Sequence, residues 1–241
     1  MHRFANPARF HRFSRRVQPC LSLATLLSLG IGLWLALLQS PPDYQQGEAV
    51  RIMFLHVPSA WLSMAGYALL AALGAALLVW RHPLAALIAR AAAPVGACFA
   101  LTCLLTGSLW GRPMWGTYWV WDARLTSMLL LLFLYLGHIA LSRAYDYPER
   151  GDRTAAILAL IGVINLPIIK FSVDWWNTLH QPASVFRVGG STIDGSLLKP
   201  LLTMAVAFTL LFFTLHLAAM RNEILRRRVR TLRLMQASAA S

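Results

Sequence analysis

The sequence has few charged residues and few cysteines. Only 13% of its 241 residues are charged, whereas 58% are hydrophobic. A soluble domain has about a quarter charged residues, so this composition argues against a soluble protein and indicates a membrane protein. Three cysteines are too few for a disulfide scaffold.

Two motif classes are also missing. The chain has no G-x-x-x-x-G-K-[ST] loop, and its two lysines, Lys170 and Lys199, lie outside glycine-rich segments. Any ATP hydrolysis would therefore come from a partner. There is no C-x-x-C pair, which argues against a thiol-reducing role, and Cys20, Cys98 and Cys103 all fall in apolar stretches.

Six apolar stretches are long enough to cross about 30 Å of hydrocarbon, and inside lipid they must be helices. We predict an all-α polytopic membrane protein with six transmembrane helices. A single membrane domain over 19–220 lies between a basic arm (1–18) and a basic tail (221–241). The first stretch has no A-x-A site before Pro41, so we expect it to be retained. The stretches are Pro19–Gln39, Ile52–Trp80, Ala91–Trp110, Leu125–Leu141, Ala155–Phe171 and Leu201–Met220.

Basic residues exceed acidic ones, 22 against 9, and they gather on alternate connections. By the positive-inside rule, both termini are cytoplasmic. We interpret the arginine-rich tail as a helix end near anionic headgroups of the lipid bilayer, not as a nucleic-acid site. The arginines on the inner side are Arg3, Arg9, Arg12, Arg15, Arg16, Arg81, Arg90, Arg143, Arg150, Arg153, Arg221, Arg226, Arg227, Arg228, Arg230 and Arg233.

This topology sorts the seven histidines. Only His56, one turn into the second span, and His180, in the outer connection 172–200, fall on the outer half. His138 and His216 lie near the inner leaflet. If the segment ending at His180 forms an interfacial helix, Trp176 and His180 share one face at i, i+4 spacing.

Tryptophans crowd the outer connection 107–126, between the third and fourth spans. An aromatic belt at the membrane interface explains one or two per connection. It does not explain Trp110, Trp115, Trp119 and Trp121 together. Trp115 and Trp119 share a face in a helix or in an extended strand, joined by Asp122 in the first case and by Trp121 in the second.

A flat indole surface, two outer histidines and several arginines suggest a planar, amphipathic, anionic ligand that can be coordinated axially. Heme fits this description, since imidazoles ligate iron, indoles cover the ring and guanidinium groups meet propionates. Arg51, Arg112, Arg124 and Arg187 are the candidates for the propionates. The alternative is an aromatic belt with structural histidines, which spacing alone leaves open.

The residues of 107–126 resemble the tryptophan-rich WWD signature of heme-handling proteins. Further matches are Pro42–Gly47, Leu55–Pro58, Ile161–Pro167 and Trp175–Gln181. Together they resemble the heme exporter protein C family, a six-span component of bacterial cytochrome c maturation. The arm, the last span and the tail resemble the family only in their general character and carry no specific motif.

This resemblance implies that His56 and His180 are axial ligands of a transiently bound, non-covalent heme b. The absence of C-x-x-C-H agrees with a heme that is not covalently attached. Arg124 gains weight from its place in the signature, and Arg51 and Arg112 are further candidates for the heme-binding residues. The resemblance further implies that Trp115, Trp119, Trp121 and Asp122 form a platform for the heme. Gly111 and Gly116 are the two glycines that let this segment turn closely.

The resemblance also implies partners. Heme at the outer face of the bacterial inner membrane passes to a periplasmic heme chaperone, and ATP-binding-cassette subunits with a small single-span membrane protein later release the loaded chaperone. The chain is then a heme-delivery protein and not an enzyme. Two alternatives are a bis-histidine membrane cytochrome for quinol-linked electron transfer, with His138 and His216 as the candidate inner pair, and a transporter of heme through the bilayer.

Three polar features have simpler interpretations. We expect Lys170 to extend toward the membrane interface. Pro167, with Asn165 and Gly162, predicts a kink in the fifth span, because proline removes one backbone donor. The sequence does not choose whether Asp122 orients Arg124, the loop backbone or a histidine.

Overall fold

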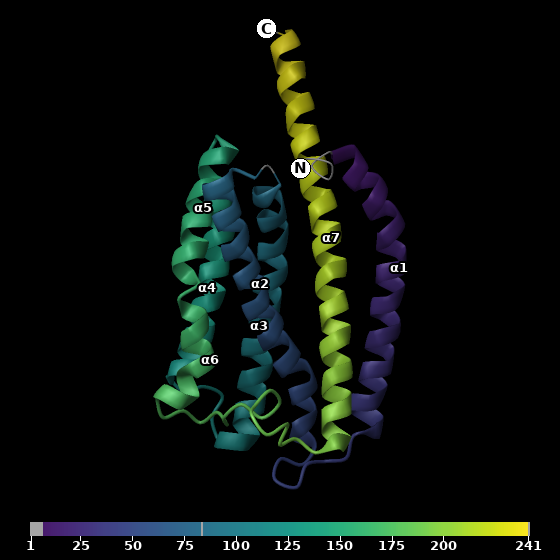
Figure 1. Ribbon diagram of the computed structural model, residues 1–241, viewed down its shortest axis with the longest axis vertical. Helices are drawn as coiled ribbons and strands as arrows, with labels where there is room; N and C mark the ends of the chain where they lie inside the picture. The colour runs from purple at the N-terminus through teal and green to yellow at the C-terminus, as the bar shows by residue number, and fades with distance from the viewer. Residues whose placement is uncertain (1–6, 83, 241) are drawn as a thin grey trace.

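Helices run through most of residues 7–82 and 84–240, the part of the chain described by a computed structural model (Figure 1). This part contains no β-strand, only an isolated bridge between Asp43 and Gly47. Arg3 of the predicted arm lies outside the described residues. The α-helices are α1 (Pro7–Trp34), α2 (Met53–Trp80), α3 (Ala85–Trp115), α4 (Ala123–Arg143), α5 (Pro148–Gly162), α6 (Asn165–Trp175) and α7 (Gly195–Ala240).

Two short turns complete the helical elements. A π-helical turn, Leu35–Gln39, continues α1, and a 3-10 turn, Glu48–Ile52, leads into α2. Counted with these turns, six segments of the described chain are long and apolar enough to cross a membrane, the shortest having 21 residues. At 1.5 Å per residue, this shortest segment spans about 30 Å. In the described residues the predicted all-α architecture is confirmed, with six helical segments long and apolar enough to span a membrane.

The fifth span consists of two helices, α5 and α6, with a break at Val163 and Ile164. Pro167 has no N–H to donate to the carbonyl of Val163, four residues earlier. The N–H of Leu166 donates to that carbonyl instead, at 3.0 Å. The predicted kink is therefore confirmed, and it lies one turn before the proline.

Several helices are longer than their apolar stretches predicted. The third begins at Ala85, six residues before the predicted boundary, and therefore includes Arg90. Arg90 was placed in a connection because its charge interrupts the apolar run. In the structure its Nε donates to Oδ1 of Asp152 on α5, at 2.5 Å, so the charge is paired inside the bundle. The prediction failed because the partner comes from a distant helix.

The two ends of the chain also continue as helix. The predicted arm belongs to α1 from Pro7 onward, and α7 does not end at Met220 but continues to Ala240. Apolar content marks where a helix enters lipid, and it gives no signal for where a helix continues into water.

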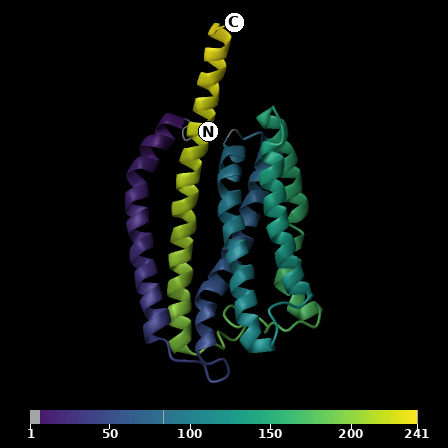
Figure 2. The ribbon, with the colours of Figure 1, turned by 180° about the vertical axis from the view of Figure 1, so that it is seen from behind.

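The helices pack into two groups. α2 to α6 form one bundle, while α1 packs mainly on α7, which in turn contacts α2 and α3 (Figures 1 and 2). Both ends of the described chain lie at one end of the molecule. The loops 40–47, 116–122 and 176–194 lie at the opposite end, at the bottom of Figure 1.

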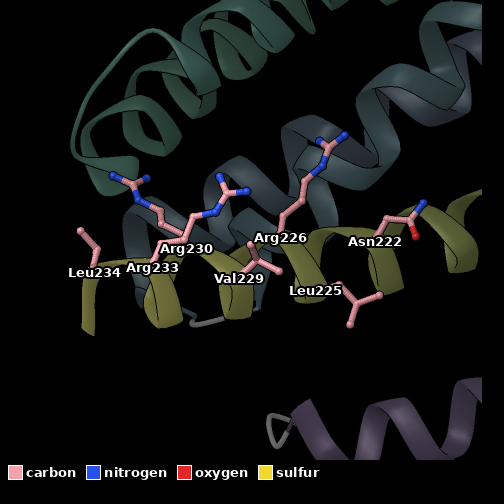
Figure 3. A pocket seen from close by; sticks show the side chains of 7 residues that line it. All are labelled: Asn222, Leu225, Arg226, Val229, Arg230, Arg233 and Leu234. Atoms are coloured by element: carbon pink, nitrogen blue, oxygen red, sulfur yellow. The ribbon is translucent and has the colours of Figure 1, made fainter. Parts of the chain in front are cut away.

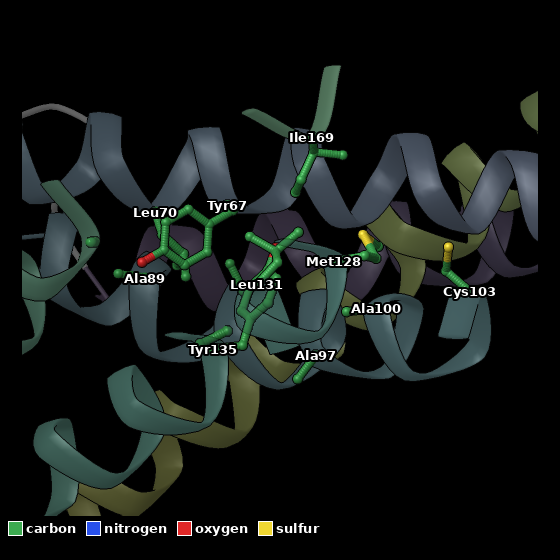
Figure 4. Close-up of a cluster of buried hydrophobic side chains, with 13 residues drawn as sticks. Tyr67, Leu70, Ala89, Ala97, Ala100, Cys103, Met128, Leu131, Tyr135 and Ile169 are labelled. Atoms are coloured by element: carbon green, nitrogen blue, oxygen red, sulfur yellow. The ribbon is translucent and has the colours of Figure 1, made fainter. Parts of the chain in front are cut away.

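The centre of the bundle is a cluster of fully buried side chains that includes Tyr67, Leu131 and Tyr135 (Figure 4). The two tyrosine rings meet edge to face, 5.1 Å apart. The hydroxyl of Tyr135 donates to the carbonyl of Ser63 at 2.7 Å, which satisfies its polar atom inside the core. Gly96 leaves room for this ring, since a Cβ there would overlap the phenol of Tyr135.

Gly96→Val is expected to lower the stability of the protein by about 1–3 kcal/mol, because the added side chain forces the buried ring of Tyr135 to move. The thermal unfolding midpoint in detergent measures this effect. Gly30→Val is the matched control, since a Cβ at Gly30 on α1 has nothing within 4 Å. Equal midpoints for the two variants would contradict the packing described here.

Candidate functional site

The loop end of the bundle brings together the predicted site residues from three parts of the chain. His56 lies near the start of α2, Asp122 and Arg124 at the start of α4, and His180 in the loop 176–194. His180 is near enough to His56, Asp122 and Arg124 for their charges to interact. These four residues therefore lie near one another at the loop end of the bundle.

His56 is held by the neighbouring helix α3. Its Nδ1 lies 3.0 Å from the carbonyl oxygen of Cys103 and 3.2 Å from the hydroxyl of Thr106. A carbonyl only accepts, so this geometry favours the tautomer with the proton on Nδ1. The other ring nitrogen, Nε2, then carries a free lone pair, as a metal ligand requires.

One face of α3 shapes the space around this imidazole. A Cβ at Gly107 would lie 2.8 Å from Cε1 of His56, so glycine leaves room for the ring. Trp110, one turn further, meets His56 edge-on, with ring centroids 5.7 Å apart. Its indole Nε1 donates to Oε1 of Gln46 at 3.0 Å, which joins α3 to the first loop.

The tryptophan-rich segment 107–126 already included Gly107 and Trp110, but the sequence did not predict their contact with His56, and it did not point to Thr106. Trp110 was interpreted as the end of the third span, so the helical face that it shares with Cys103 and Gly107 was not considered. Gly107 and Trp110 lie four and seven residues after Cys103, and this helical spacing was the signal that could have placed them on one face.

His180 contacts both the tryptophan-rich segment and Asp122. Its ring lies edge-on to Trp115, with centroids 4.9 Å apart, and its Nδ1 is 3.7 Å from Oδ2 of Asp122. Burial lowers the pKa of His180 to about 4; Arg124 adds to this shift and Asp122 opposes it. The imidazole is therefore neutral at pH 7, the form that binds metal ions.

Asp122 has two roles, which the sequence could not separate. Its Oδ1 accepts the N–H of Leu125 at 2.7 Å and caps α4, while its Oδ2 faces His180. Among the described residues, neither Oδ2 of Asp122 nor Nδ1 of His180 has a hydrogen-bond partner. A shift of less than 1 Å would bring these two atoms into hydrogen-bond range.

The tryptophan-rich segment is not one regular element. Its first part is the last turns of α3, which end at Trp115, and Gly116 then turns the chain at a φ of +76°. The prediction that Trp115 and Trp119 share a face of one helix or strand is therefore wrong, because this turn separates them. The close turn at Gly116 is confirmed, but the turn expected at Gly111 is wrong, because Gly111 lies inside α3. There it leaves room for the ring of Trp115, 3.1 Å from an added Cβ.

Beyond the turn, Trp119 and Trp121 meet edge to face, 5.4 Å apart. Trp121 is 77% exposed. Trp119 is more buried, and its indole Nε1 has no hydrogen-bond partner within the described part of the chain. An N–H left in this state can donate to a bound ligand.

The interfacial helix considered for the segment ending at His180 does not reach this histidine. α6 ends at Trp175, and Trp176 is extended, with φ −137° and ψ 155°. The N–H of His180 is bonded to the hydroxyl of Thr178 at 3.3 Å, so a local turn places the imidazole. Contact with Trp115 and Asp122, not helical spacing from Trp176, positions this histidine.

Three of the candidate arginines have protein partners. Arg124 joins α4 to α6, through Nε to the hydroxyl of Ser172 at 3.0 Å and through Nη2 to the carbonyl of Lys170 at 3.2 Å. Arg112 donates to the carbonyl of Gly116 and lies over the ring of Tyr118. Arg51 pairs with Glu48.

Arg51 also caps the end of the first span. Its Nη1 donates to the carbonyls of Ala36 and Leu37, at 2.8 and 2.7 Å, and these groups lie at the helix end where backbone acceptors lack partners. Arg187, the fourth candidate, lies exposed in the loop 176–194.

The inner histidines lie elsewhere and pack as structural residues. Nδ1 of His138 is 3.1 Å from the carbonyl of Ala155, and His216 stacks on Phe212 with ring centroids 5.9 Å apart. The cavity that His138 lines has a volume of about 10 Å³, enough for roughly one water molecule and far too small for a porphyrin. This packing gives no support to a heme beside His138.

Comparison with known proteins extends the match beyond the tryptophan-rich motif. A family model described as heme exporter protein C matches residues 1–235. The chain belongs to the heme exporter protein C family. The match includes the basic arm and the last span, outside Pro42–Gln181 where the motifs are specific.

Curated relatives from distant organisms are similar over most of their length. Heme exporter protein C of Bradyrhizobium diazoefficiens is 65% identical over 234 residues, which cover 97% of this chain and 89% of that protein. The protein of the same name from Escherichia coli (strain K12) is 48% identical over 225 residues, 93% of this chain and 91% of its own. A mitochondrial protein of Marchantia polymorpha, named for cytochrome c biosynthesis, is 46% identical over 195 residues, covering 80% of this chain and 81% of that protein.

Proposed function

We propose that this protein binds heme through His56 and His180 and delivers it to a periplasmic heme chaperone during the biogenesis of c-type cytochromes. The observation that carries the proposal is the pair of histidines at one end of the bundle. Each directs Nδ1 toward an acceptor, the carbonyl of Cys103 or the carboxylate of Asp122, and so leaves Nε2 for iron. The name of the relatives, heme exporter protein C, supports the same cargo.

The proposed orientation places both termini in the cytoplasm and the site on the periplasmic face of the bacterial inner membrane. The arginine-rich arm (1–18) and tail (221–241) support it through the positive-inside rule. The ends of the described chain lie on the same side of the bundle, opposite the loops that carry His180 and the tryptophans (Figure 1). A single membrane domain over 19–220 then separates the two faces.

The residues present suit a heme cargo. The imidazoles of His56 and His180 would ligate the iron, and Trp115, Trp119 and Trp121 would lie against the ring. The unpartnered Nε1 of Trp119 suits a propionate, as do the candidate arginines. No C-x-x-C-H is present to attach heme covalently, which supports transient binding of heme b.

In this proposal the chain's own residues bind and orient, and no bond in the cargo is made or broken. Asp122 and the carbonyl of Cys103 would fix the ring tautomers, and Gly107 would keep space for His56. ATP-binding-cassette subunits and a small single-span protein would supply the energy-consuming release step, because the chain lacks a phosphate-binding loop.

Asp122→Asn is expected to weaken heme binding about 10–100-fold without unfolding the protein. Asparagine caps a helix as well as aspartate, so the bond from Leu125 survives. Its amide N–H₂ would donate toward His180, and this favours the tautomer with the proton on Nε2. Titration of the purified protein with heme gives the affinity.

Asp43→Asn is the control for this variant, since Oδ1 of Asp43 also accepts backbone N–H groups, from Gln45 and Gln46, but lies in the first loop. The control should bind heme as the unchanged protein does. Unchanged affinity in Asp122→Asn would remove Asp122 from the proposed ligand environment.

Handover tests the delivery role. Replacing Trp115 and Trp119 together with alanine should slow heme transfer to the chaperone about tenfold, because the cargo loses two aromatic contacts. Chaperone-bound heme, followed over time in membranes that contain the complete maturation complex, measures the rate. Trp80→Ala is the control at the opposite end, where the indole is 73% exposed. Equal rates in the double variant and the control would reduce these tryptophans to membrane anchors.

A further inference from the structure

The last helix continues well past the bundle. Arg233 lies twelve residues beyond Arg221 on α7, a rise of about 18 Å at 1.5 Å per residue. Figures 1 and 2 both show the end of α7 running on in the direction of the bundle axis, beyond every other helix. The headgroup layer on each side of a bilayer is only about 5–8 Å thick. A helix in this direction carries Arg233 past the lipid headgroups.

Ion pairs fix the direction of this segment. Arg227 lies 3.5 Å from Glu223 on its own helix and 3.9 Å from Asp152 on α5. Arg230 donates to the carbonyl of Asp146, in the loop between α4 and α5, at 2.6 Å. These contacts tie the segment to the bundle as far as Arg230, so its outer face keeps one orientation.

The segment has a large excess of positive charge. Its only acidic residue is Glu223, which is already close to Arg226 and Arg227. Arg228 and Arg233 have no carboxylate within ion-pair distance in the described chain. Charge complementarity therefore calls for an acidic ligand.

The shape of the surface narrows the class of that ligand. Arg226, Arg230 and Arg233 recur on one face of α7 and line an open groove of about 550 Å³ (Figure 3). Leu225, Val229 and Leu234 line the same groove. A row of guanidinium groups flanked by aliphatic side chains suits carboxylates and apolar side chains together, as an acidic amphipathic helix presents them.

We propose that this groove docks an acidic amphipathic helix of a cytoplasmic partner protein. Carboxylates one helical turn apart would pair with Arg226, Arg230 and Arg233, and aliphatic side chains of the partner would lie against Leu225 and Val229. The docking surface lies at the end of the molecule opposite the histidines. It rests on the cytoplasmic orientation put forward above but not on heme binding.

Site-specific photo-crosslinking in the full-length protein tests this proposal. A photoreactive phenylalanine replaces Val229, and the protein is irradiated in its native membranes. We expect a crosslink to a soluble protein that maps to an acidic segment. The yield should fall at least about tenfold when Arg226, Arg230 and Arg233 are all changed to glutamine. Changing Arg12, Arg15 and Arg16 to glutamine removes the same charge from α1 at the same end and should leave the yield unchanged.

Crosslinks to lipid or nucleic acid alone, or a yield indifferent to the three tail arginines, would overturn the proposal. A separate measurement tests the orientation. Ala237→Cys should resist a membrane-impermeant maleimide in intact cells and react after lysis. Reaction in intact cells would overturn both the orientation and the cytoplasmic partner, whereas protection without the crosslink would overturn only the docking surface.

Discussion

Removal of either outer histidine is expected to convert a six-coordinate, low-spin heme into a weakly bound species with one protein ligand. His56→Ala and His180→Ala should each lower heme affinity at least about 100-fold, since loss of an outer-shell partner alone costs 10–100-fold. The Soret and α bands of the purified protein, together with its electron paramagnetic resonance spectrum, measure both effects. The double variant should retain no low-spin signal.

The inner histidines are the matched controls. His138 bonds the carbonyl of Ala155 and His216 stacks on Phe212, so alanine at either position removes a buried imidazole far from the proposed ligands. Both variants should keep the low-spin spectrum. If these two variants lose it while the outer pair keep it, the protein is a bis-histidine cytochrome instead of a delivery protein.

Gly107→Val is expected to impair heme binding almost as severely as His56→Ala, although Gly107 has no side chain to offer a ligand. Its added Cβ alone would lie 2.8 Å from Cε1 of His56, closer than such atoms approach in proteins. The imidazole must move away from Cys103 and Thr106, and its Nε2 moves with it. The measurement is the heme spectrum, taken beside a thermal unfolding curve that reports the fold.

Two further variants test whether the loss of heme binding in Gly107→Val comes from the displaced ring of His56. Gly107→Ala adds only the Cβ and should give an intermediate loss, because the end of a side chain can shift more easily than backbone. Gly30→Val adds the same bulk to a helix where nothing lies within 4 Å, and should bind heme normally. Normal heme binding by Gly107→Val would mean that the position of His56 does not control the site.

The membrane architecture could be predicted because its signals are local. Apolar length defines the six spans, and the missing N–H of Pro167 predicts the break between α5 and α6. The start of α3 could not be predicted in this way. Arg90 interrupts the apolar run, and only the fold reveals that Asp152, on a distant helix, neutralises it.

For the candidate site, too, some residues could be predicted from the sequence and others could not. His56 and His180 could be selected from seven histidines because the arginines predict which half of each span faces outward. The groups that hold the two rings could not be selected, since the contacts of His56 with Cys103, Thr106 and Trp110 arise where α2 packs on α3. The helical spacing considered between Trp176 and His180 does not apply for the same reason, because contacts across the loops place His180.

An electron cryo-microscopy structure of the full-length protein with heme bound tests the central claim most directly. We predict that the iron lies at the loop end of the bundle, between Nε2 of His56 and Nε2 of His180, with the indole of Trp115 beside it. Iron ligated by any other side chain, or a heme at the end that carries the termini, would contradict the proposed site.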